Sequence, residues 1–464
     1  MTKKPIIYPY IPNSVPAVKE AMLKAVNAKS VEDFYADIPE SIRFKGRLNL
    51  PEPFLSEAAL VRHVEGLLSK NQSTREMLSF LGAGCSQHYV PAVCDEINSR
   101  GEFLTAYAGE PYEDHGRFQA LFEYESMMGE LLNMDVVNVP VYDGFQATAT
   151  ALRMAGRITG RNIALLPATV MPDKLSKIRD YLKPDMQVEL VAFEESTGLM
   201  NLNALRKQIN TQTAAVFIEN PSYLGFLETQ AEEIGKIAHA GGALFVVGVD
   251  PISLGVINPP VEYGGDIVCG DIQSLGIHMH YGGGQAGFIA SKDEERIVME
   301  YPSRLFGVAT TRVEGEYGFG DVAYERTSFA VREEGKEWVG TAAALWGITA
   351  GVYLALMGPQ GMEELGRGIM QRVRYAVRKL NQVSGVKTRF SVTPHFKEFV
   401  ADFNGTGRTV EQINQALLEK GIFGGKDLSA EFPSLGQCAL YCVTEVHTQA
   451  DMDTLANAIA EATK

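Results

Sequence analysis

The sequence predicts an α/β protein with a large domain built on a mainly parallel β-sheet, a helical N-terminal arm and a small C-terminal α+β domain. Three observations indicate this arrangement. Short apolar segments alternate with amphipathic helical segments in the middle of the chain, residues 1–80 carry helical but no strand patterns, and the pattern changes again after residue 335. Continuous apolar runs joined by helices are typical of parallel strands, which are buried on both faces.

The predicted arm, residues 1–80, is punctuated by prolines, and helical segments begin near residues 15, 31 and 57. The last of these, residues 57–71, is amphipathic. We expect such an arm to pack on another surface.

The predicted large domain, residues 81–335, begins with a helix at 118–134 and a strand at 136–142. Further apolar segments predict the other strands, and the segments between them predict helices. The strands are expected at 162–167, 188–193, 214–220, 243–249 and 266–271, and the helices at 145–160, 173–182, 201–210 and 229–240.

The predicted small domain, residues 336–464, opens with two helical segments, 340–358 and 363–383. The first is apolar and rich in small residues, so we expect it to be buried. Strands at 397–403 and 437–445 then enclose a helix at 410–421, and a last helix covers 449–463.

Composition excludes several classes of function. The chain has 57 acidic and 42 basic residues and a net charge of −15, which argues against nucleic-acid or anionic-membrane binding. The sequence shows neither a membrane span nor a secretion signal, since no apolar run is long enough. Five cysteines without a pairing pattern are typical of a reducing compartment, so we expect a cytoplasmic protein.

One stretch has the pattern of a pyridoxal phosphate site that lacks its anchor. An Asp at a strand end, followed about 20–30 residues later by a lysine, is typical of such sites. There the Asp pairs with the pyridine nitrogen and the lysine forms the Schiff base. Asp250 ends an apolar run, but Gly276, Ile277 and His278 stand where the lysine is expected. Lys292 follows the next strand at its far end, and the alternative role of Asp250 is to cap the following turn.

Asp143, Gly144 and Phe145 join a predicted strand to a predicted helix. Because free N–H groups point out of a helix N-terminus, a phosphate can bind there. The alternative is a plain joint in which Asp143 caps the helix. Its carboxylate would also repel a phosphate placed beside it.

His278 and His280 lie on one side of a segment expected to be extended. A metal site needs further ligands, and since no ExxH or CxxC pattern supplies them we predict no metal. Ring stacking or structural hydrogen bonds are the favoured roles. Gly283 lies in a run of three glycines that predicts a close backbone approach.

Two polar, aromatic segments, 82–91 and 105–117, precede the first strand. Loops of this kind often complete a pocket, sometimes in a neighbouring subunit, and ordinary irregular packing is the alternative. The candidate pocket or partner-interface residues in them are His88, Tyr89, Tyr107, Tyr112 and His115.

Together these features resemble the P-protein family of the glycine cleavage system, and within it the lysine-free subunit 1 of the two-subunit bacterial glycine decarboxylase, glycine dehydrogenase (decarboxylating). The resemblance runs almost end to end. Its sharpest segments are YIPNS (10–14), ADIPESIRFKGRLNLPEP (36–53), FLGAGCSQHYVPAV (80–93), AY (106–107), QALFEYESMMGELLNMDVVN (119–138), YDG (142–144), VDPISLGVINPPVEYGGDIVCGDIQSLGI (249–277) and LLEKGIFGG (417–425).

This resemblance implies a pyridoxal-phosphate-dependent aminotransferase-like fold of type I. It also implies a partner, glycine decarboxylase subunit 2, which holds the pyridoxal phosphate on its lysine. The family reaction decarboxylates glycine and passes the aminomethyl group to lipoyl carrier protein. An oligomer, in the family a heterotetramer, is expected, and no catalytic residue is expected in this chain itself.

The chain differs from the family pattern at 108–117, at the run of glycines and at 338–347. These differences leave other hypotheses open. The chain would then be a divergent paralogue, either a structural or regulatory homologue without chemistry or an enzyme for another amino acid. In a third hypothesis, the chain is an independent enzyme in which His278 or His280 replaces the lysine and holds a cofactor or ligand without a covalent bond.

Overall fold

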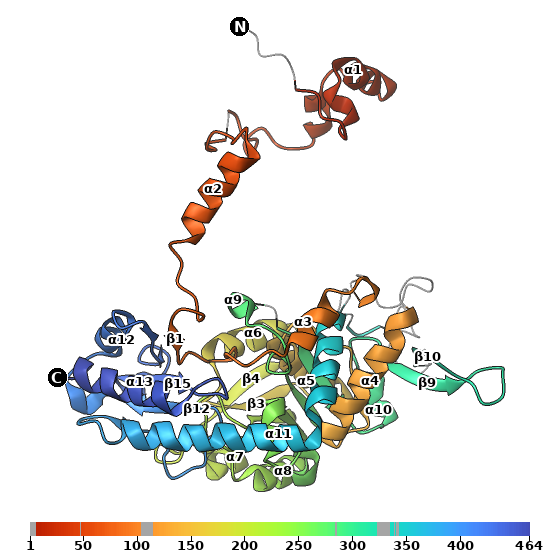
Figure 1. The fold of residues 1–464 in the computed structure, drawn as a ribbon. Helices are drawn as coiled ribbons and strands as arrows, with labels where there is room; N and C mark the ends of the chain where they lie inside the picture. Colours follow the sequence, from red (N-terminus) through yellow and green to blue (C-terminus); the bar gives the residue numbers. More distant parts are fainter. Residues whose placement is uncertain are drawn as a thin grey trace. The chain divides into compact units, whose positions relative to one another are not determined.

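A computed structural model describes residues 6–46, 48–103, 115–283, 285–322, 335–337, 339 and 343–464 (Figure 1). These residues form two compact units, one ending at Asn71 and the other beginning at Gln72. No helix in the described ranges combines the length and apolarity that a membrane crossing requires. The division of the sequence at residues 80 and 335 stays a prediction.

The N-terminal unit is helical, as the sequence predicts, but it has no core. Its elements are η1 (Pro12–Ser14), α1 (Pro16–Ala25), η2 (Val31–Tyr35) and α2 (Glu57–Leu68), and none of them contains a buried residue. Leu60, Val64 and Leu67 follow one another at helical spacing along α2, and all three are exposed. The apolar face of this helix is therefore uncovered within the described chain.

The second unit is organised around a seven-stranded sheet. The inner strands run parallel, whereas β8 is antiparallel to both of its neighbours, β7 and β2. The mainly parallel sheet is therefore confirmed. Its order is β2 (Val136–Val137), β8 (Gly287–Ser291), β7 (Ile267–Asp271), β6 (Leu244–Val249), β5 (Thr213–Glu219), β3 (Ile163–Pro167) and β4 (Gln187–Val191).

The predicted strand at 136–142 is mostly wrong. Only β2 pairs regularly, and Val141 adds an isolated bridge to Gly287. Pro140 has no N–H group to donate, which limits regular pairing here. The side chain of Asn138 accepts the N–H of Ile289 at 2.7 Å in place of a backbone carbonyl.

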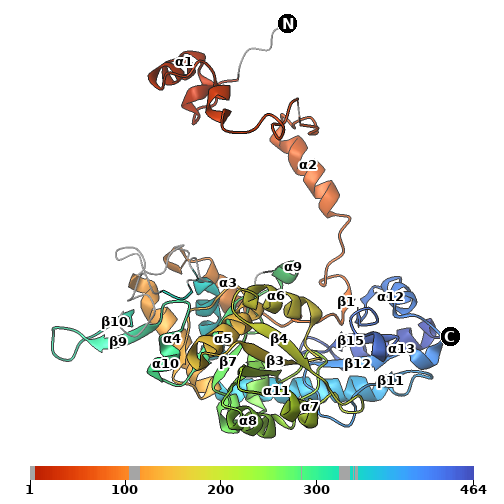
Figure 2. The ribbon, with the colours of Figure 1, turned by 180° about the vertical axis from the view of Figure 1, so that it is seen from behind.

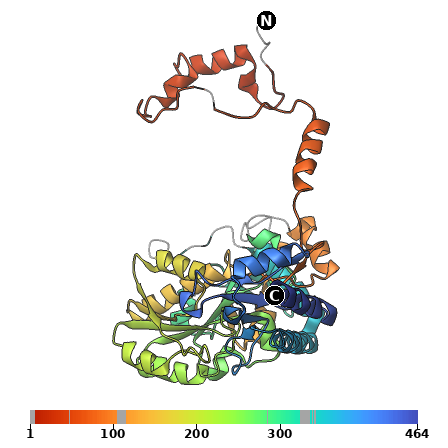
Figure 3. The ribbon, with the colours of Figure 1, turned by 90° about the vertical axis from the view of Figure 1, so that its left-hand side faces the viewer.

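Both faces of the sheet are buried, which explains its continuous apolar runs. Along β6, Phe245 and Val247 pack in one hydrophobic core, whereas Leu244 and Val246 pack in another. Helices cover both faces (Figures 2 and 3). The first core includes residues of α4 (His115–Leu132), α7 (Leu202–Gln208), α8 (Ala231–Ala240) and α11 (Ala344–Leu380), and the second includes residues of α5 (Gly144–Thr159) and α6 (Pro172–Leu182).

The C-terminal part carries a four-stranded antiparallel sheet, and its two predicted strands are confirmed as β12 and β15. The order is β11 (Lys387–Thr388), β12 (Glu398–Asp402), β15 (Cys438–Cys442) and β14 (Lys426–Asp427), with α12 (Val410–Leu418) and α13 (Gln449–Ala462) beside it. Residues 78–79, which carry no strand pattern, form β1 (Leu78–Ser79) and pair with β13 (Ile422–Phe423).

The two helices predicted at 340–358 and 363–383 are one element, α11, broken at Gly358, whose φ is +58°, and Pro359. A hairpin that the sequence patterns do not predict, β9 (Phe306–Thr310) and β10 (Tyr317–Asp321), projects beside α4 (Figure 1). The remaining short helices are α3 (Ala92–Asn98), α9 (His280–Gly283) and α10 (Glu295–Val298).

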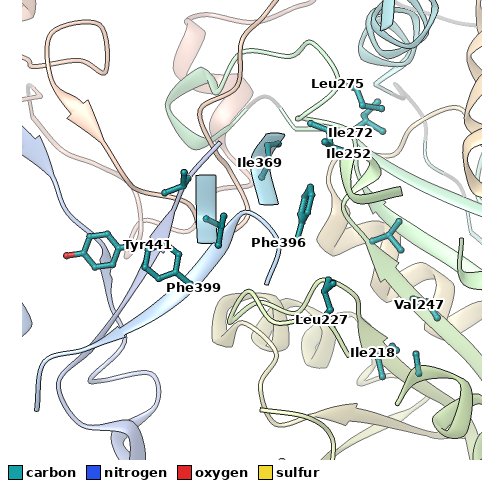
Figure 4. Close-up of a cluster of buried hydrophobic side chains, with 14 of the residues drawn as sticks. Ile218, Leu227, Val247, Ile252, Ile272, Leu275, Ile369, Phe396, Phe399 and Tyr441 are labelled. Atoms are coloured by element: carbon teal, nitrogen blue, oxygen red, sulfur yellow. The ribbon is translucent and has the colours of Figure 1, made fainter. Parts of the chain in front are cut away.

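An apolar cluster joins the large sheet to the C-terminal sheet (Figure 4). Ile218 of β5 and Val247 of β6 lie at one end of it, and Phe399 of β12 lies at the other. Phe396 and Ile369 fill the space between them. Burial of apolar side chains on this scale holds the two sheets in one unit.

The absence of a core in the N-terminal unit predicts that the second unit folds alone. Removing residues 1–71 should change the thermal unfolding temperature of the isolated chain by no more than a few degrees, because no buried residue is lost. Removing residues 1–80 is the control. That deletion also takes β1 and the fully buried Phe80 and should lower the unfolding temperature clearly. Equal stability of the two truncated chains would contradict this division.

Candidate functional site

A cavity of about 140 Å³ lies at the carboxyl ends of β5, β6 and β7. Its walls also include the first turn of α5 and residues 396–398, which lead into β12. In open α/β sheets, ligands bind outside the carboxyl ends of the strands. This cavity is therefore the candidate site.

Three strand ends bring a carboxylate to this edge, and all three line the cavity. Glu219 ends β5, Asp250 follows β6 and Asp271 ends β7. A buried carboxylate is unfavourable unless it is paired or hydrogen-bonded. Each of the three has such partners within the chain.

Asp250 uses both of its oxygens. Oδ1 accepts the N–H of Ile252 at 3.0 Å and the hydroxyl of Ser274 at 3.3 Å, and Oδ2 accepts the ammonium of Lys397 at 2.5 Å. Burial acts to raise the pKa of Asp250, but Lys397 and His88 outweigh it, so the pKa is lowered. Asp250 is therefore an ion-paired carboxylate that also caps the turn after β6, as the alternative interpretation of the sequence proposes.

The N-terminus of α5 is capped by two carboxylates. Asp143 Oδ1 accepts the N–H of Gln146 at 2.7 Å, and Asp271 Oδ2 accepts the N–H of Gly144 at 2.8 Å. Burial raises the pKa of Asp271 to about 7, even though the hydrogen bond from Gly144 acts in the opposite direction. Two of the backbone donors that could bind a phosphate at this helix end, the N–H groups of Gly144 and Gln146, already have acidic partners.

Lys174, in the first turn of α6, neutralises Glu219. Its ammonium donates to Glu219 Oε1 at 2.7 Å and lies 5.9 Å from the ring centre of Phe145. Lys177 approaches the same ring to 4.4 Å. Both lysines are within the range of cation–π attraction, so they help to fix the aromatic wall of the cavity.

Two of the three positions where the anchor is expected, Gly276 and Ile277, cannot take a lysine without rearrangement. Gly276 has φ +79°, and a Cβ atom there would lie 2.8 Å from the sulfur of Cys94 and 3.1 Å from the ring of Tyr353. Ile277 is buried in the core, and Lys292 donates instead to the carbonyl of Asn133 at the other end of β8. The anchor lysine is absent. Packing closes positions 276 and 277, whereas His278 is exposed.

The histidine segment forms an exposed turn, so the prediction of an extended segment is wrong. His280 and Tyr281 both have positive φ angles, 45° and 59°. His278 Nε2 lies 2.9 Å from a carboxylate oxygen of Asp95, and the ring centre of His280 lies 5.3 Å from that of Trp346. These are the structural hydrogen bond and the ring contact that the sequence favours.

Gly283 makes no close approach within the chain, because an added Cβ atom would meet nothing within 4 Å. The same is true of Gly282, whose φ of +86° supplies the turn. In the described residues, no group of three histidine, cysteine or acidic side chains could hold a metal ion.

In loop 82–91, His88 and Tyr89 have opposite roles. His88 is buried, with Nδ1 3.0 Å from Glu445 Oε2 and Nε2 3.1 Å from the hydroxyl of Ser86. Tyr89 donates its backbone N–H to Glu445 at 2.7 Å, but its side chain is exposed. These hydrogen bonds fix the loop to the rest of the chain and leave the side chain of Tyr89 exposed. Of the loop residues, Gly84 lines the cavity.

Three predicted residues cannot be placed. Tyr107 and Tyr112 lie outside the described residues, and so does the side chain of His115. Of the other nine, the structure brings Gly144, Phe145 and Asp250 together in the cavity wall.

A family model for the glycine cleavage system P-protein matches residues 9–459. The chain belongs to that family. The probable glycine dehydrogenase (decarboxylating) subunit 1 of Staphylothermus marinus is 38% identical over 463 residues, which cover 98% of both chains. The protein of the same description from Thermococcus onnurineus is 36% identical, over 97% of this chain and 99% of its own.

Solved structures agree with this P-protein assignment. A crystal structure of glycine decarboxylase, the P-protein of the glycine cleavage system in inhibitor-bound form, superposes with a TM-score of 0.82 at 33% identity, over 98% of this chain and 100% of the other. A sphingosine-1-phosphate lyase from Burkholderia pseudomallei has a TM-score of 0.65 at 13% identity, which shows the fold alone. The predicted family and the type I fold are both confirmed.

The P-protein family and its fold imply pyridoxal phosphate, but the cavity of this chain does not fit that cofactor. The Schiff base has no lysine and no space at Gly276. The cation of Lys397 occupies the outer oxygen of Asp250, and the first turn of α5 is capped by Asp143 and Asp271. Two of the three attachment points are therefore taken by groups of the chain itself, and the third has no lysine.

Five charged residues of this P-protein cavity are not identified by the sequence patterns: Lys174, Glu219, Asp271, Lys397 and Glu398. Glu219 and Asp271 stand at the ends of predicted strands, so the rule that identifies Asp250 would also find them. Lys174 lies on a predicted helix, and Lys397 and Glu398 come from the C-terminal part of the chain. No local signal marks these three.

The packing at Gly276 predicts a sharp difference between two glycines with similar backbone conformations. Gly276→Ala should lower the free energy of unfolding by about 2–4 kcal/mol, since it adds overpacking to the left-handed strain. Gly282→Ala, the control with open space around it, should lower it by about 1 kcal/mol. Urea denaturation measures both values, and equal losses would show that the site is not tightly packed.

The raised pKa of Asp271 predicts a pH effect on stability. The pKa is 3.8 ordinarily and about 7 in the folded chain, so folding takes up a proton between these values. The contribution of this group to the free energy of unfolding must therefore fall as pH rises from about 4 to 7, by at most about 1.4 kcal/mol per pH unit. Above pH 7 the loss is complete.

Urea denaturation of the native chain and of Asp271→Asn at pH 5 and pH 7.5 tests this. The variant loses a hydrogen-bond acceptor at both pH values, so the informative quantity is the change with pH. The native chain should lose more stability than the variant between the two pH values. A parallel pH dependence would refute the assignment of a raised pKa to Asp271.

Proposed function

We propose that this chain is the cofactor-free subunit of a glycine decarboxylase. Its partner, a lysine-bearing subunit 2, would hold pyridoxal phosphate, decarboxylate glycine and pass the aminomethyl group to lipoyl carrier protein. The observation that carries the proposal is that groups of this chain occupy the cofactor contacts of its cavity. Lys397 pairs with Asp250, Asp143 and Asp271 cap the N-terminus of α5, and no lysine stands at 276–278. In this proposal the chain completes and stabilises the partner's pocket.

The N-terminal unit supports a partnership. None of its described residues is buried, yet it carries many large apolar side chains, including Ile42, Leu55 and Leu68. An apolar surface of this extent marks an interaction site. We propose that subunit 2 covers it, in a heterotetramer of two copies of each chain, and that the five free cysteines reflect the reducing cytoplasm.

Loop 82–91 supports the second part of the proposal, the contact with the partner's pocket. Glu445 fixes the backbone of Tyr89, while the side chain of Tyr89 is directed away from the chain. Aromatic side chains presented on a rigid backbone are favoured at protein interfaces. Tyr107, Tyr112 and His115 stay candidates for the same contact.

Reconstitution of the complex tests this function. The chain is purified alone and mixed with subunit 2, and the exchange of the glycine carboxyl group with labelled bicarbonate is measured. Activity should require both chains, and the chain alone should show no visible absorbance from a Schiff base after incubation with pyridoxal phosphate. No effect on subunit 2 would favour a regulatory homologue, and exchange with another amino acid alone would favour a different substrate.

Substitution of Tyr89 predicts an effect confined to the assembled enzyme. Tyr89→Ala should lower the exchange activity of the complex at least about tenfold, as loss of an interface anchor does, and leave the stability of the isolated chain nearly unchanged. Tyr317→Ala is the matched control, since this tyrosine on β10 is exposed to 67% and Tyr89 to 66%. Equal effects of both substitutions on activity would argue against a role for loop 82–91.

A further inference from the structure

Lys397 reaches the candidate site from the C-terminal part of the chain. It directly precedes β12 in the C-terminal sheet, whereas Asp250, its partner, follows β6 in the large sheet. The two residues are 147 positions apart in the chain. Their ion pair is therefore a direct polar link between the two sheets.

The backbone holds Lys397 in an unfavourable conformation. Its φ is +63°, in the left-handed region that a residue with a side chain rarely adopts. Neighbouring hydrogen bonds maintain this turn, from Val443 N–H to the carbonyl of Lys397 at 2.8 Å and from Phe396 N–H to the carbonyl of Gly225 at 3.0 Å. Strain of this kind persists where the surroundings require it, and it clusters at functional sites.

The pair is largely buried, with side-chain exposures of 14% for Lys397 and 16% for Asp250, and one side of it is apolar. Phe396, next to Lys397, lies among the apolar side chains of Ile252 and Leu275 in Figure 4. Attraction between opposite charges is stronger in such an environment than at the surface, and either charge alone would be costly there. Burial acts to lower the pKa of Lys397, but Asp250 outweighs it, so the amine stays charged at neutral pH.

We propose that the ammonium of Lys397 occupies the place on the Asp250 carboxylate that the protonated ring nitrogen of a bound ligand would otherwise take. A carboxylate at the end of this strand suits a positively charged ring N–H, and here the lysine supplies the positive N–H donor from within the chain. The ammonium excludes a ring compound from the cavity and fixes residues 396–398 against the large sheet. The proposal rests on the proposed function, in which this chain is the subunit that holds no cofactor.

Chemical rescue tests the replacement in the isolated chain. Lys397→Ala removes the ammonium and leaves Asp250 unpaired in a small cavity. The probe is 4-aminopyridine, which is protonated on its ring nitrogen at neutral pH, and aniline is the neutral ring of the same size. Lys426→Ala is the matched control variant, because Lys426 makes a 2.5 Å ion pair with Glu431 in the C-terminal part.

Lys397→Ala should unfold at a lower temperature than the native chain, and 4-aminopyridine should restore at least half of the difference. Aniline should not restore it, and neither ring should stabilise the native chain or Lys426→Ala. The double variant Lys397→Ala, Asp250→Asn should gain nothing from 4-aminopyridine. An unchanged unfolding temperature of Lys397→Ala, or rescue that does not depend on Asp250, overturns the proposal.

If Lys397→Ala does not fold, Lys397→Met keeps the apolar stem of the lysine and is compared with Asp250→Asn. Each substitution alone should lower the urea midpoint, and the double variant should lose less than the sum of the two. Additive losses overturn the proposal. These experiments use the isolated chain without a partner subunit. A negative result in them therefore does not contradict the glycine decarboxylase proposal, and a failed reconstitution does not contradict the role of Lys397.

Discussion

The ion pair between Asp250 and Lys397 is the constraint on which the candidate site depends. A buried charge is tolerated only when its partners satisfy it, and this pair satisfies itself with help from the N–H of Ile252 and the hydroxyl of Ser274. The pair therefore fixes three pieces of chain at one point: the end of β6, the segment after β7 and the start of β12. The apolar cluster around Phe396 covers one side of the pair, which makes the attraction stronger than that between surface charges (Figure 4).

Other charged groups of the cavity also have their partners within the chain. Glu219 is matched by Lys174, and the carboxylates of Asp143 and Asp271 meet the N–H groups at the start of α5. Each of these charged groups at the carboxyl ends of the strands or at the start of α5 is satisfied from within the chain. A cavity whose charged groups are all paired within the chain is stable without a ligand. This is consistent with the proposed function, in which the chain acts through its contacts with a partner subunit.

The parts of this structure that depend on local sequence were predictable. Continuous apolar runs such as 243–249 indicate buried parallel strands, and the missing lysine after Asp250 can be seen from spacing alone. The cation on Asp250 could not be foreseen, because Lys397 lies in another sheet and its sequence neighbourhood predicts only a strand. The extended conformation expected around His278 failed for a related reason, since no propensity predicts positive φ angles at His280 and Tyr281.

The obstacles to cofactor binding in this cavity do not rest on a single residue. A lysine placed at Gly276 would collide with Cys94 and Tyr353, and it would face an Asp250 that already has its cation. Removing Lys397 would free that carboxylate but leave the start of α5 closed to a phosphate by Asp143 and Asp271. Because these obstacles lie on different segments, cofactor binding by this chain would require simultaneous changes in all of them. The type I fold is thus combined with a cavity whose charged groups are paired within the chain.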